Sequence, residues 1–283
     1  MIELLFLYGL AFIWLIFAVI SDIKCREIPN WLNFSLIIFA LGFRLFYSLF
    51  YSENFSFFLQ GIIGFLIFLV LANLFYYIKM FAGGDMKLMI SLGAVLPIFP
   101  IFAQNLKIFF LFILLYLFVG AIYGLFLSFT ISIINFEKFR NGFSSLFNIN
   151  KRFILFCTFF AVIFLFLSFY IENLFFIGII LFFFPYFYLF LKSVDDFCMV
   201  RRVSTKKITV GDWLYKDVKI GKKVIRATWD GLSEEDIKLL QKKSEVFLRY
   251  GIQFAPVFLI SFILLWISLE TSWFSLFFRM IGF

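Results

Sequence analysis

The sequence predicts an all-α polytopic membrane protein with about eight transmembrane helices and a small cytoplasmic α+β insertion before the last helix. Two observations predict this fold class. The 283 residues are 64% hydrophobic, with a mean hydropathy of +1.05, whereas soluble domains are about 45–50% apolar. The apolar residues also form separate runs of about 20 residues, the length that a helix needs to cross a bilayer.

Eight apolar segments are candidates for membrane spans. They lie at residues 2–20, 31–51, 56–78, 88–104, 107–135, 153–171, 174–191 and 251–269. The first lacks the positively charged start and the cleavage site of a secretory signal, so we expect it to be retained as a helix. The fourth contains Pro97 and Pro100, which predict a kink or a partly re-entrant segment.

The distribution of lysine and arginine predicts the orientation of the helices. Four loops, 21–30, 79–87, 136–152 and 192–250, carry 22 of the 25 basic residues. The positive-inside rule therefore places these loops in the cytoplasm and the N-terminus outside, in a multi-pass protein of the cell membrane. The net charge of +8 is thus explained by the basic residues of the loops that we expect to be cytoplasmic. Because nine acids are interspersed in residues 192–250, we expect no nucleic-acid partner.

We expect three parts along the chain. Residues 1–191 form the membrane domain, residues 192–250 a small cytoplasmic domain, and residues 251–283 the final transmembrane helix with an interfacial tail. About 55 residues hold only a small core, so we expect the cytoplasmic part to pack on the membrane domain.

The cytoplasmic part contains both strand and helix signals. Alternating apolar residues predict strands near residues 207–210 and 218–225. The residues from Ser233 to Asp236 resemble a capping box, and we expect a helix from Glu234 to about Tyr250.

Two aspartates support the functional hypothesis. Asp22 closes the first apolar segment, and Asp85 lies just before the fourth, near the expected start of a helix. An ionisable side chain at a membrane boundary is costly, which indicates a function. Both aspartates fall in loops predicted to be cytoplasmic, so they can act on one substrate.

Residues with special backbone properties accompany both aspartates. Pro29 and Asn30 follow the first; proline restricts the chain, and asparagine suits a helix start. Gly83 and Gly84 precede the second, and glycine permits close approach of another segment. We expect these four residues to shape the loops, and Lys87 to pair with the second aspartate.

The composition excludes several catalytic schemes. The chain has no histidine, and its three cysteines, Cys25, Cys157 and Cys198, form no C-x-x-C pair. These facts argue against the usual zinc sites, histidine-ligated haem and Ser-His or Cys-His catalysis, and we expect no metal and no cofactor. Two neighbouring carboxylates need none of these groups, because one can activate a water while the other polarises the scissile carbonyl.

Other interpretations stay open at this point. A single aspartate at the end of a span is usually a solvated boundary residue. The pair could also carry cations or protons in a transporter or channel, although the spans are poor in other polar residues. A non-catalytic assembly factor that binds cytosolic partners through residues 192–250 is a third possibility.

Two motifs resemble those of the type IV prepilin peptidases, the membrane aspartic proteases named for a GxGD motif. The stretch from Asp22 to Asn30, DIKCREIPN, resembles their loop with an aspartate followed by Arg-x-Ile-Pro-Asn. The stretch from Gly84 to Leu88, GDMKL, resembles their second loop, although Ala82 replaces its first glycine. The order of the motifs and their separation also match.

The resemblance implies an aspartic endopeptidase with Asp22 and Asp85 as the catalytic pair. The archaeal branch, whose substrates are preflagellins and pilin-like proteins, is the most similar. The implied partners are the lipid bilayer and precursors that carry a short basic leader before a hydrophobic helix, cleaved at the cytoplasmic face. The cysteine-rich insert of the bacterial enzymes has no counterpart here, so we expect no N-methylation.

Overall fold

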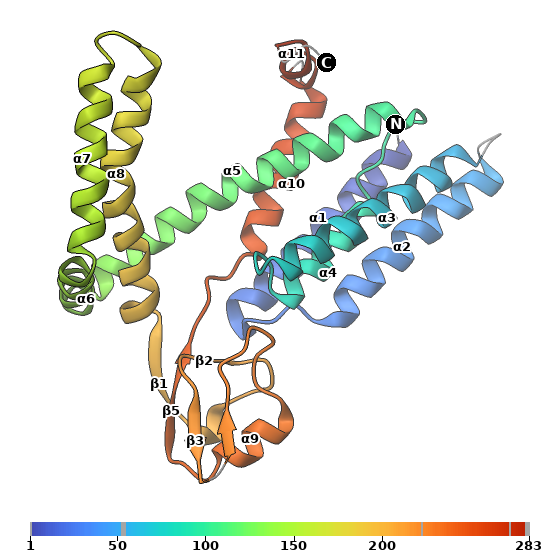
Figure 1. The fold of residues 1–283 in the computed structure, drawn as a ribbon. Helices are drawn as coiled ribbons and strands as arrows, with labels where there is room; N and C mark the ends of the chain where they lie inside the picture. The colour runs from blue at the N-terminus through green and yellow to red at the C-terminus, as the bar shows by residue number, and fades with distance from the viewer. Residues whose placement is uncertain (1, 52–54, 222, 272, 281–283) are drawn as a thin grey trace. The chain divides into compact units, whose positions relative to one another are not determined.

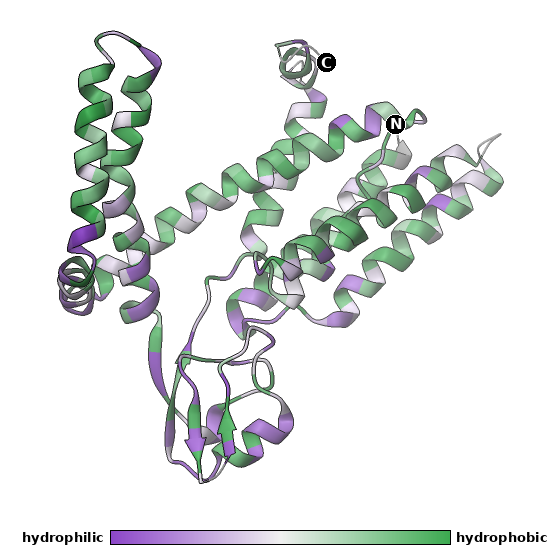
Figure 2. Ribbon diagram, in the orientation of Figure 1, coloured by the Kyte–Doolittle hydropathy of each residue, from purple (hydrophilic) through white to green (hydrophobic). Residues whose placement is uncertain are grey.

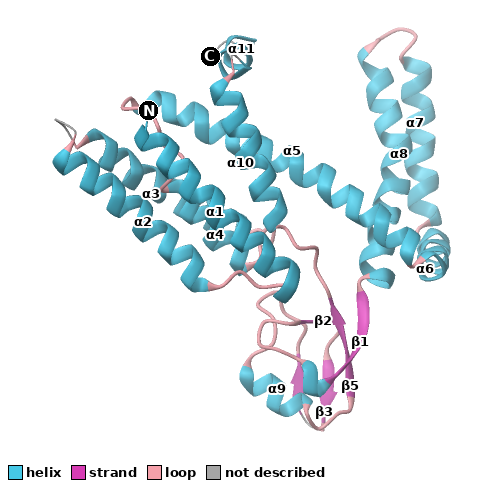
Figure 3. Cartoon of the chain, turned by 180° about the vertical axis from the view of Figure 1, so that it is seen from behind, coloured by secondary structure: helices cyan, strands magenta, loops and turns pink. Residues whose placement is uncertain are grey.

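The structure is a computed structural model that describes residues 2–51, 55–221, 223–271 and 273–280 (Figures 1 and 3). Its long helices are α1 (Ile2–Cys25), α2 (Asn30–Phe50), α3 (Ser56–Tyr77), α5 (Phe102–Ile134), α7 (Lys151–Leu167), α8 (Asn173–Ser193) and α10 (Ala255–Glu270). Shorter helices are α4 (Gly83–Gly93), α6 (Phe136–Ile149), α9 (Glu234–Leu240) and α11 (Trp273–Met280). The strands are β1 (Val200–Ser204), β2 (Trp213–Leu214), β3 (Val218–Ile220), β4 (Lys223–Ile225) and β5 (Glu245–Arg249).

A multi-pass helical membrane protein is confirmed. Within the described residues, five helical stretches are long and apolar enough to cross a membrane: Leu4–Cys25, Asn30–Phe50, Ser56–Tyr77, Phe102–Ile134 and Asn173–Cys198. The number rises to seven if the bent pairs α6–α7 and α10–α11 each count as one span. Figure 2 shows that these helices are hydrophobic along most of their length. The expected count of eight transmembrane helices is not confirmed.

The fourth expected span is not a continuous helix. Helix α4 ends at Gly93, and a non-helical stretch leads from there to α5. Lys87, in α4, is bonded to Asn30 at the start of α2, whereas Ser56 and Gln60 in the first turns of α3 donate to the Pro100 carbonyl at 3.2 and 3.3 Å. The segment therefore runs from the Asn30 end of α2 to the Ser56 end of α3, first as the helix α4 and then as a non-helical stretch of turns and bends.

Buried side chains satisfy the backbone of this non-helical stretch. Arg44 of α2 donates to the carbonyls of Ala94 and Val95, each at 2.9 Å, and also to the carbonyl of Pro97. Asn105 of α5 accepts from the backbone N–H groups of residues 98 and 99 at 3.0 and 2.9 Å. Because no water is present in hydrocarbon, non-helical backbone at membrane depth is tolerated only with such internal partners.

The chain forms two compact units, which we describe separately. The first comprises residues 1–123 and 253–283. In it, α1 packs on α2 and α10, while α4 packs on α2 and α3. Gly93 lies directly against α3, since a Cβ at this position would be 2.7 Å from the Gly64 carbonyl oxygen. The core lines the inner faces of α1, α4, α5 and α10 and includes Leu15, Met89, Phe112, Phe258 and Phe262.

The second unit, residues 124–252, contains the helices α6–α8 and all the strands. Helices α7 and α8 pack along each other (Figure 1). Strands β1, β5 and β2 form an antiparallel sheet in that order, and β3 pairs with β4. A small core beneath the strands includes Ile208, Leu214, Leu240 and Leu248. The predicted sheet region is confirmed, while its cytoplasmic location and the domain boundaries at 191 and 250 stay predictions.

Two details of this region differ from the expectation. The capping box at Ser233 and Asp236 is present, but α9 ends at Leu240 instead of continuing to Tyr250. The residues that follow form β5, in which Val246 and Leu248 are buried and Phe247 is exposed. This period of two, together with pairing to β1, outweighs the helical pattern. The strand expected at residues 207–210 is absent, and β1 precedes it.

Candidate functional site

Asp22 lies in the last turn of α1 rather than in a loop. The helix continues to Cys25 because the residues from Ser21 onward are good enough helix formers, and it ends where Arg26 adopts a positive φ of 57°. The side chain of Asp22 is only 7% exposed. Its Oδ2 accepts a hydrogen bond of 3.0 Å from the backbone N–H of Ala255, the first residue of α10. The aspartate thus lies at a helix N-terminus, where an acceptor with negative charge is favoured.

Asp85 lies in the first turn of α4, three residues after the N-cap Ala82. Its side chain is half-buried. Gly83 and Gly84 complete the same turn, and neither has a positive φ. A Cβ at Gly84 would lie 3.5 Å from Ile28 Cβ, in van der Waals contact, whereas the space around Gly83 is open. Their role in shaping the loop stays a prediction.

The two motif segments lie against each other. Gly84 faces Ile28, since a Cβ on Gly84 would touch the Ile28 side chain, and Lys87 Nζ donates to Asn30 Oδ1 at 2.6 Å. The first segment is held in shape by a 2.8 Å hydrogen bond from Ser21 Oγ to the carbonyl of Glu27. Helix packing therefore joins the two sequence motifs at one end of the first unit.

Two expectations about these loop residues are wrong in detail. Pro29, with φ −60° and ψ 137°, is the N-cap of α2, and Asn30 is the first helical residue rather than the cap. Its side-chain oxygen is therefore available to accept from Lys87. The expected pairing of Lys87 with Asp85 is replaced by this hydrogen bond.

The two aspartates interact electrostatically. Burial and, next, the negative charge of Asp22 raise the pKa of Asp85 to about 7, while a hydrogen bond from the backbone of Ala82 opposes this shift. Near neutral pH a substantial fraction of molecules therefore carries a proton on Asp85. One neutral and one ionised carboxyl group at the same site can serve as an acid and a base.

Helix α5 contributes two tyrosines that the sequence interpretation missed. The Tyr116 phenol is within electrostatic range of Asp85, and that of Tyr123 is within range of Asp22. The two lie seven residues apart, on one face of the helix. Between them, Gly120 faces the ring of Phe254, the N-cap residue of α10; a Cβ on Gly120 would make an ordinary van der Waals contact with this ring, at 3.4 Å. The i, i+4, i+7 spacing of Tyr116, Gly120 and Tyr123 is the signal that could have identified this face.

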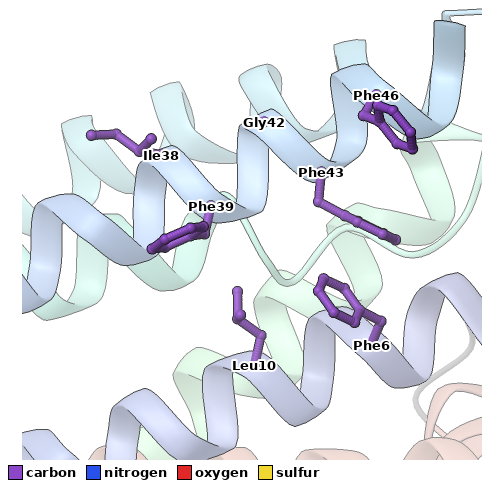
Figure 4. A pocket seen from close by; sticks show the side chains of 7 residues that line it. All are labelled: Phe6, Leu10, Ile38, Phe39, Gly42, Phe43 and Phe46. Carbon is purple, nitrogen blue, oxygen red and sulfur yellow. The ribbon is translucent and has the colours of Figure 1, made fainter.

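An apolar pocket of about 430 Å³ lies elsewhere in the first unit (Figure 4). It is lined by Phe6 and Leu10 of α1 and by Ile38, Phe39, Gly42, Phe43 and Phe46 of α2. Phe6 and Asp22 are sixteen residues apart, which places them about 24 Å apart along α1. The pocket offers no group for acid–base chemistry and is not the candidate site.

Known proteins are similar to the part of the chain that contains these residues. Residues 9–125 match the model of the type IV leader peptidase family. The preflagellin peptidase of Methanocaldococcus jannaschii is 36% identical over 85 residues, 30% of this chain and 36% of that protein. The preflagellin peptidase of Methanococcus voltae is 29% identical over 99 residues, 34% of this chain and 42% of that protein. The matches thus span less than half of either relative, and no solved structure matches the chain.

The matched region is the part of the chain that holds Asp22, Asp85 and the segments that join them. Over residues 9–125, the chain is similar to the type IV leader peptidase family.

Proposed function

We propose that the chain is a membrane-embedded aspartic endopeptidase that removes the short basic leader from prepilin- or preflagellin-like precursors. The observation that carries this proposal is the meeting of the two family motifs. Ile28 faces Gly84, Asn30 accepts from Lys87, and the charge of Asp22 acts on Asp85. The family match and the two preflagellin peptidases similar to this chain support the same activity.

In the proposed mechanism, the two aspartates divide the acid and base roles. Asp85, in its protonated form, donates a hydrogen bond to the scissile carbonyl and so makes its carbon more electrophilic. Ionised Asp22 takes a proton from a water as that water attacks the carbon. Collapse of the tetrahedral intermediate returns a proton to the departing amine and breaks the C–N bond.

The proposed topology places the site in the cytoplasm. The Lys- and Arg-rich loops would face inward, with the N-terminus outside. Helix α4 and the extended stretch after it would make the fourth of eight crossings, because this segment covers the distance from one end of α2 to the other. A precursor with a basic leader would then present its cleavage site where both aspartates lie, with its hydrophobic helix already in the bilayer.

The transporter or channel alternative has less support. Such a protein needs polar groups along a path through the membrane, whereas Asp22, in the last turn of α1, and Asp85, in the first turn of α4, lie at one end of the first unit. The polar groups further along, Arg44, Gln60 and Asn105, are occupied by the backbone of the non-helical stretch or by each other.

Co-expression with a precursor tests the proposal. The precursor carries a short basic leader followed by a hydrophobic helix, and the mass of the mature product reports the cleaved bond. We expect the wild-type protein to release the leader and Asp22→Asn to release none. A wild-type protein that inserts into membranes but leaves every such precursor intact would contradict the proposed function.

A further inference from the structure

Tyr116 of α5 is packed between the starts of α4 and α10, the two helix ends at which the aspartates lie. Its ring packs edge-on against Phe81, with the ring centroids 5.5 Å apart, and in a tilted arrangement against Phe258, at 4.6 Å. Phe81 directly precedes the N-cap of α4, and Phe258 lies in the first turn of α10. All three side chains are at most 3% exposed, so the position of the phenol is fixed by close packing.

The hydroxyl group of Tyr116 lies near Asp85 without being bonded to it. The phenol and the carboxyl group are within electrostatic range of each other, but none of the hydrogen bonds between described residues uses the Tyr116 hydroxyl. A buried tyrosine hydroxyl usually has a partner. Phenylalanine, which accounts for 50 residues of this chain, would fill the same space without burying a polar atom. The O–H is therefore a donor that the resting protein leaves unused beside Asp85.

A second buried tyrosine of the first unit provides a comparison. Tyr8 of α1 is 4% exposed, its ring stacks on Phe262 of α10 at 5.1 Å, and its hydroxyl also lacks a partner among the described residues. It lies fourteen residues before Asp22, which is about 21 Å along the helix. The two tyrosines are thus alike in burial and in packing against a phenylalanine of α10, but only Tyr116 lies near the aspartates.

A phenol suits the charge that develops during peptide cleavage. In the proposed mechanism, attack by water turns the scissile carbonyl oxygen into an oxyanion, which accepts a hydrogen bond from protonated Asp85. A tyrosine hydroxyl ordinarily loses its proton only near pH 10, so it is a donor wherever Asp85 is protonated. A phenol and a neutral carboxyl group that both donate to one oxygen stabilise an oxyanion strongly, because the two donors are oriented before the reaction begins.

We propose that Tyr116 is a further catalytic residue, whose hydroxyl donates a hydrogen bond to the scissile carbonyl oxygen beside Asp85. Phe81 and Phe258 hold the ring in place, and the phenol keeps its own proton while the negative charge forms on the substrate oxygen. This inference rests on the proposed function, since it adds a second donor to that reaction. It explains why the hydroxyl is unpartnered in the resting protein, because the substrate supplies the acceptor.

The test compares Tyr116→Phe with Tyr8→Phe in reconstituted full-length protein. Each change removes one buried, unpartnered oxygen and keeps the ring, so we expect neither variant to lower the melting temperature. We expect Tyr116→Phe to lower kcat by about a hundred- to a thousandfold, the usual effect of losing one oxyanion donor. KM should change little, because the hydrogen bond reaches its full strength only in the transition state. Tyr8→Phe should cleave the precursor at the wild-type rate.

The pH profile distinguishes a donor to the substrate from a residue that only holds Asp85. If the hydroxyl bonded to Asp85, its loss would favour the protonated carboxyl group and move the alkaline limb of kcat to higher pH. We expect the limb to stay at its wild-type pH in Tyr116→Phe. A wild-type kcat, a shifted limb or a lower melting temperature in Tyr116→Phe, or an equal loss of kcat in Tyr8→Phe, would overturn the inference. Failure of the wild-type protein to cleave would instead reject the proposed function.

Discussion

Lys87 Nζ donates to Asn30 Oδ1 at 2.6 Å, and this contact joins the first turns of α4 and α2. Each residue belongs to one of the two motifs, so the hydrogen bond connects the segment after Asp22 to the segment that carries Asp85. Charged donors form the stronger hydrogen bonds in proteins, although solvent weakens this one because Asn30 is exposed.

Removing this hydrogen bond is expected to lower cleavage without unfolding the protein. Lys87→Met and Asn30→Leu should each reduce kcat/KM about threefold to tenfold, because the two aspartates are then held less firmly. In a double-mutant cycle we expect a coupling of about 0.5–1 kcal/mol. Lys79→Met removes another lysine of the same loop and is the control. Additive losses in the double variant would show that the contact has no role in catalysis.

The pKa of Asp85 predicts how the cleavage rate depends on pH. Since burial and the charge of Asp22 raise it to about 7, the protonated form required of Asp85 is lost as the pH rises through 7. We therefore expect kcat to fall by about tenfold for each pH unit above that value. A rate that stays level from pH 6 to pH 9 would contradict the role of Asp85 as proton donor.

The same shift predicts a pH-dependent stability. A folded-state pKa above the ordinary carboxyl value means that the folded chain binds a proton that the unfolded chain releases between about pH 4 and 7. Wild-type stability should therefore decline over this range as the pH rises, while Asp85→Asn escapes the decline. We expect a relative gain of about 1–2 kcal/mol for Asp85→Asn at pH 8 and none at pH 4, since the side chain is only half-buried. If the melting temperatures of the wild type and Asp85→Asn differed by the same amount at pH 4 and pH 8, the raised pKa of Asp85 would be contradicted.

Arg44 is expected to be essential for stability rather than for chemistry. Its guanidinium bonds to the carbonyls of Ala94, Val95, Pro97 and Phe57, all of which lose their donor in Arg44→Met. We expect a loss of about 3 kcal/mol or more in thermal unfolding in detergent. Arg279→Met, at an exposed position of α11, should change stability by less than about 0.5 kcal/mol. Similar melting temperatures for the two variants would contradict this role of Arg44.

The helical membrane architecture followed from hydropathy, because long apolar runs have few alternatives in lipid. Pro97 and Pro100 indicated the break in the fourth apolar segment, but nothing in the sequence indicated which side chains stabilise it. Arg44 was visible in the sequence as a charge within a span, and its partners were not, because they are backbone carbonyls that any residue provides. Likewise, the helix predicted up to Tyr250 is replaced by β5, since pairing with β1 depends on residues more than forty positions away.

The candidate site was predictable in part for the same reason. Asp22 and Asp85 stood out as rare ionisable groups, whereas the donor to Asp22 is the N–H of Ala255, 233 residues later. No local pattern signals such a contact. Tyr116 and Tyr123 were two among many aromatic residues until the packing of α5 placed them near the aspartates.

The most direct test of the central claim is whether Asp22 and Asp85 act as one catalytic unit. The rate of leader removal would be measured for the wild-type protein, Asp22→Asn, Asp85→Asn and the double variant, each purified with an intact melting transition. We predict that each single variant loses about a thousandfold or more of the rate and that the double variant is no worse than either, because residues that act together lose their effect together. Substantial cleavage by either single variant, or losses that multiply in the double variant, would contradict the account.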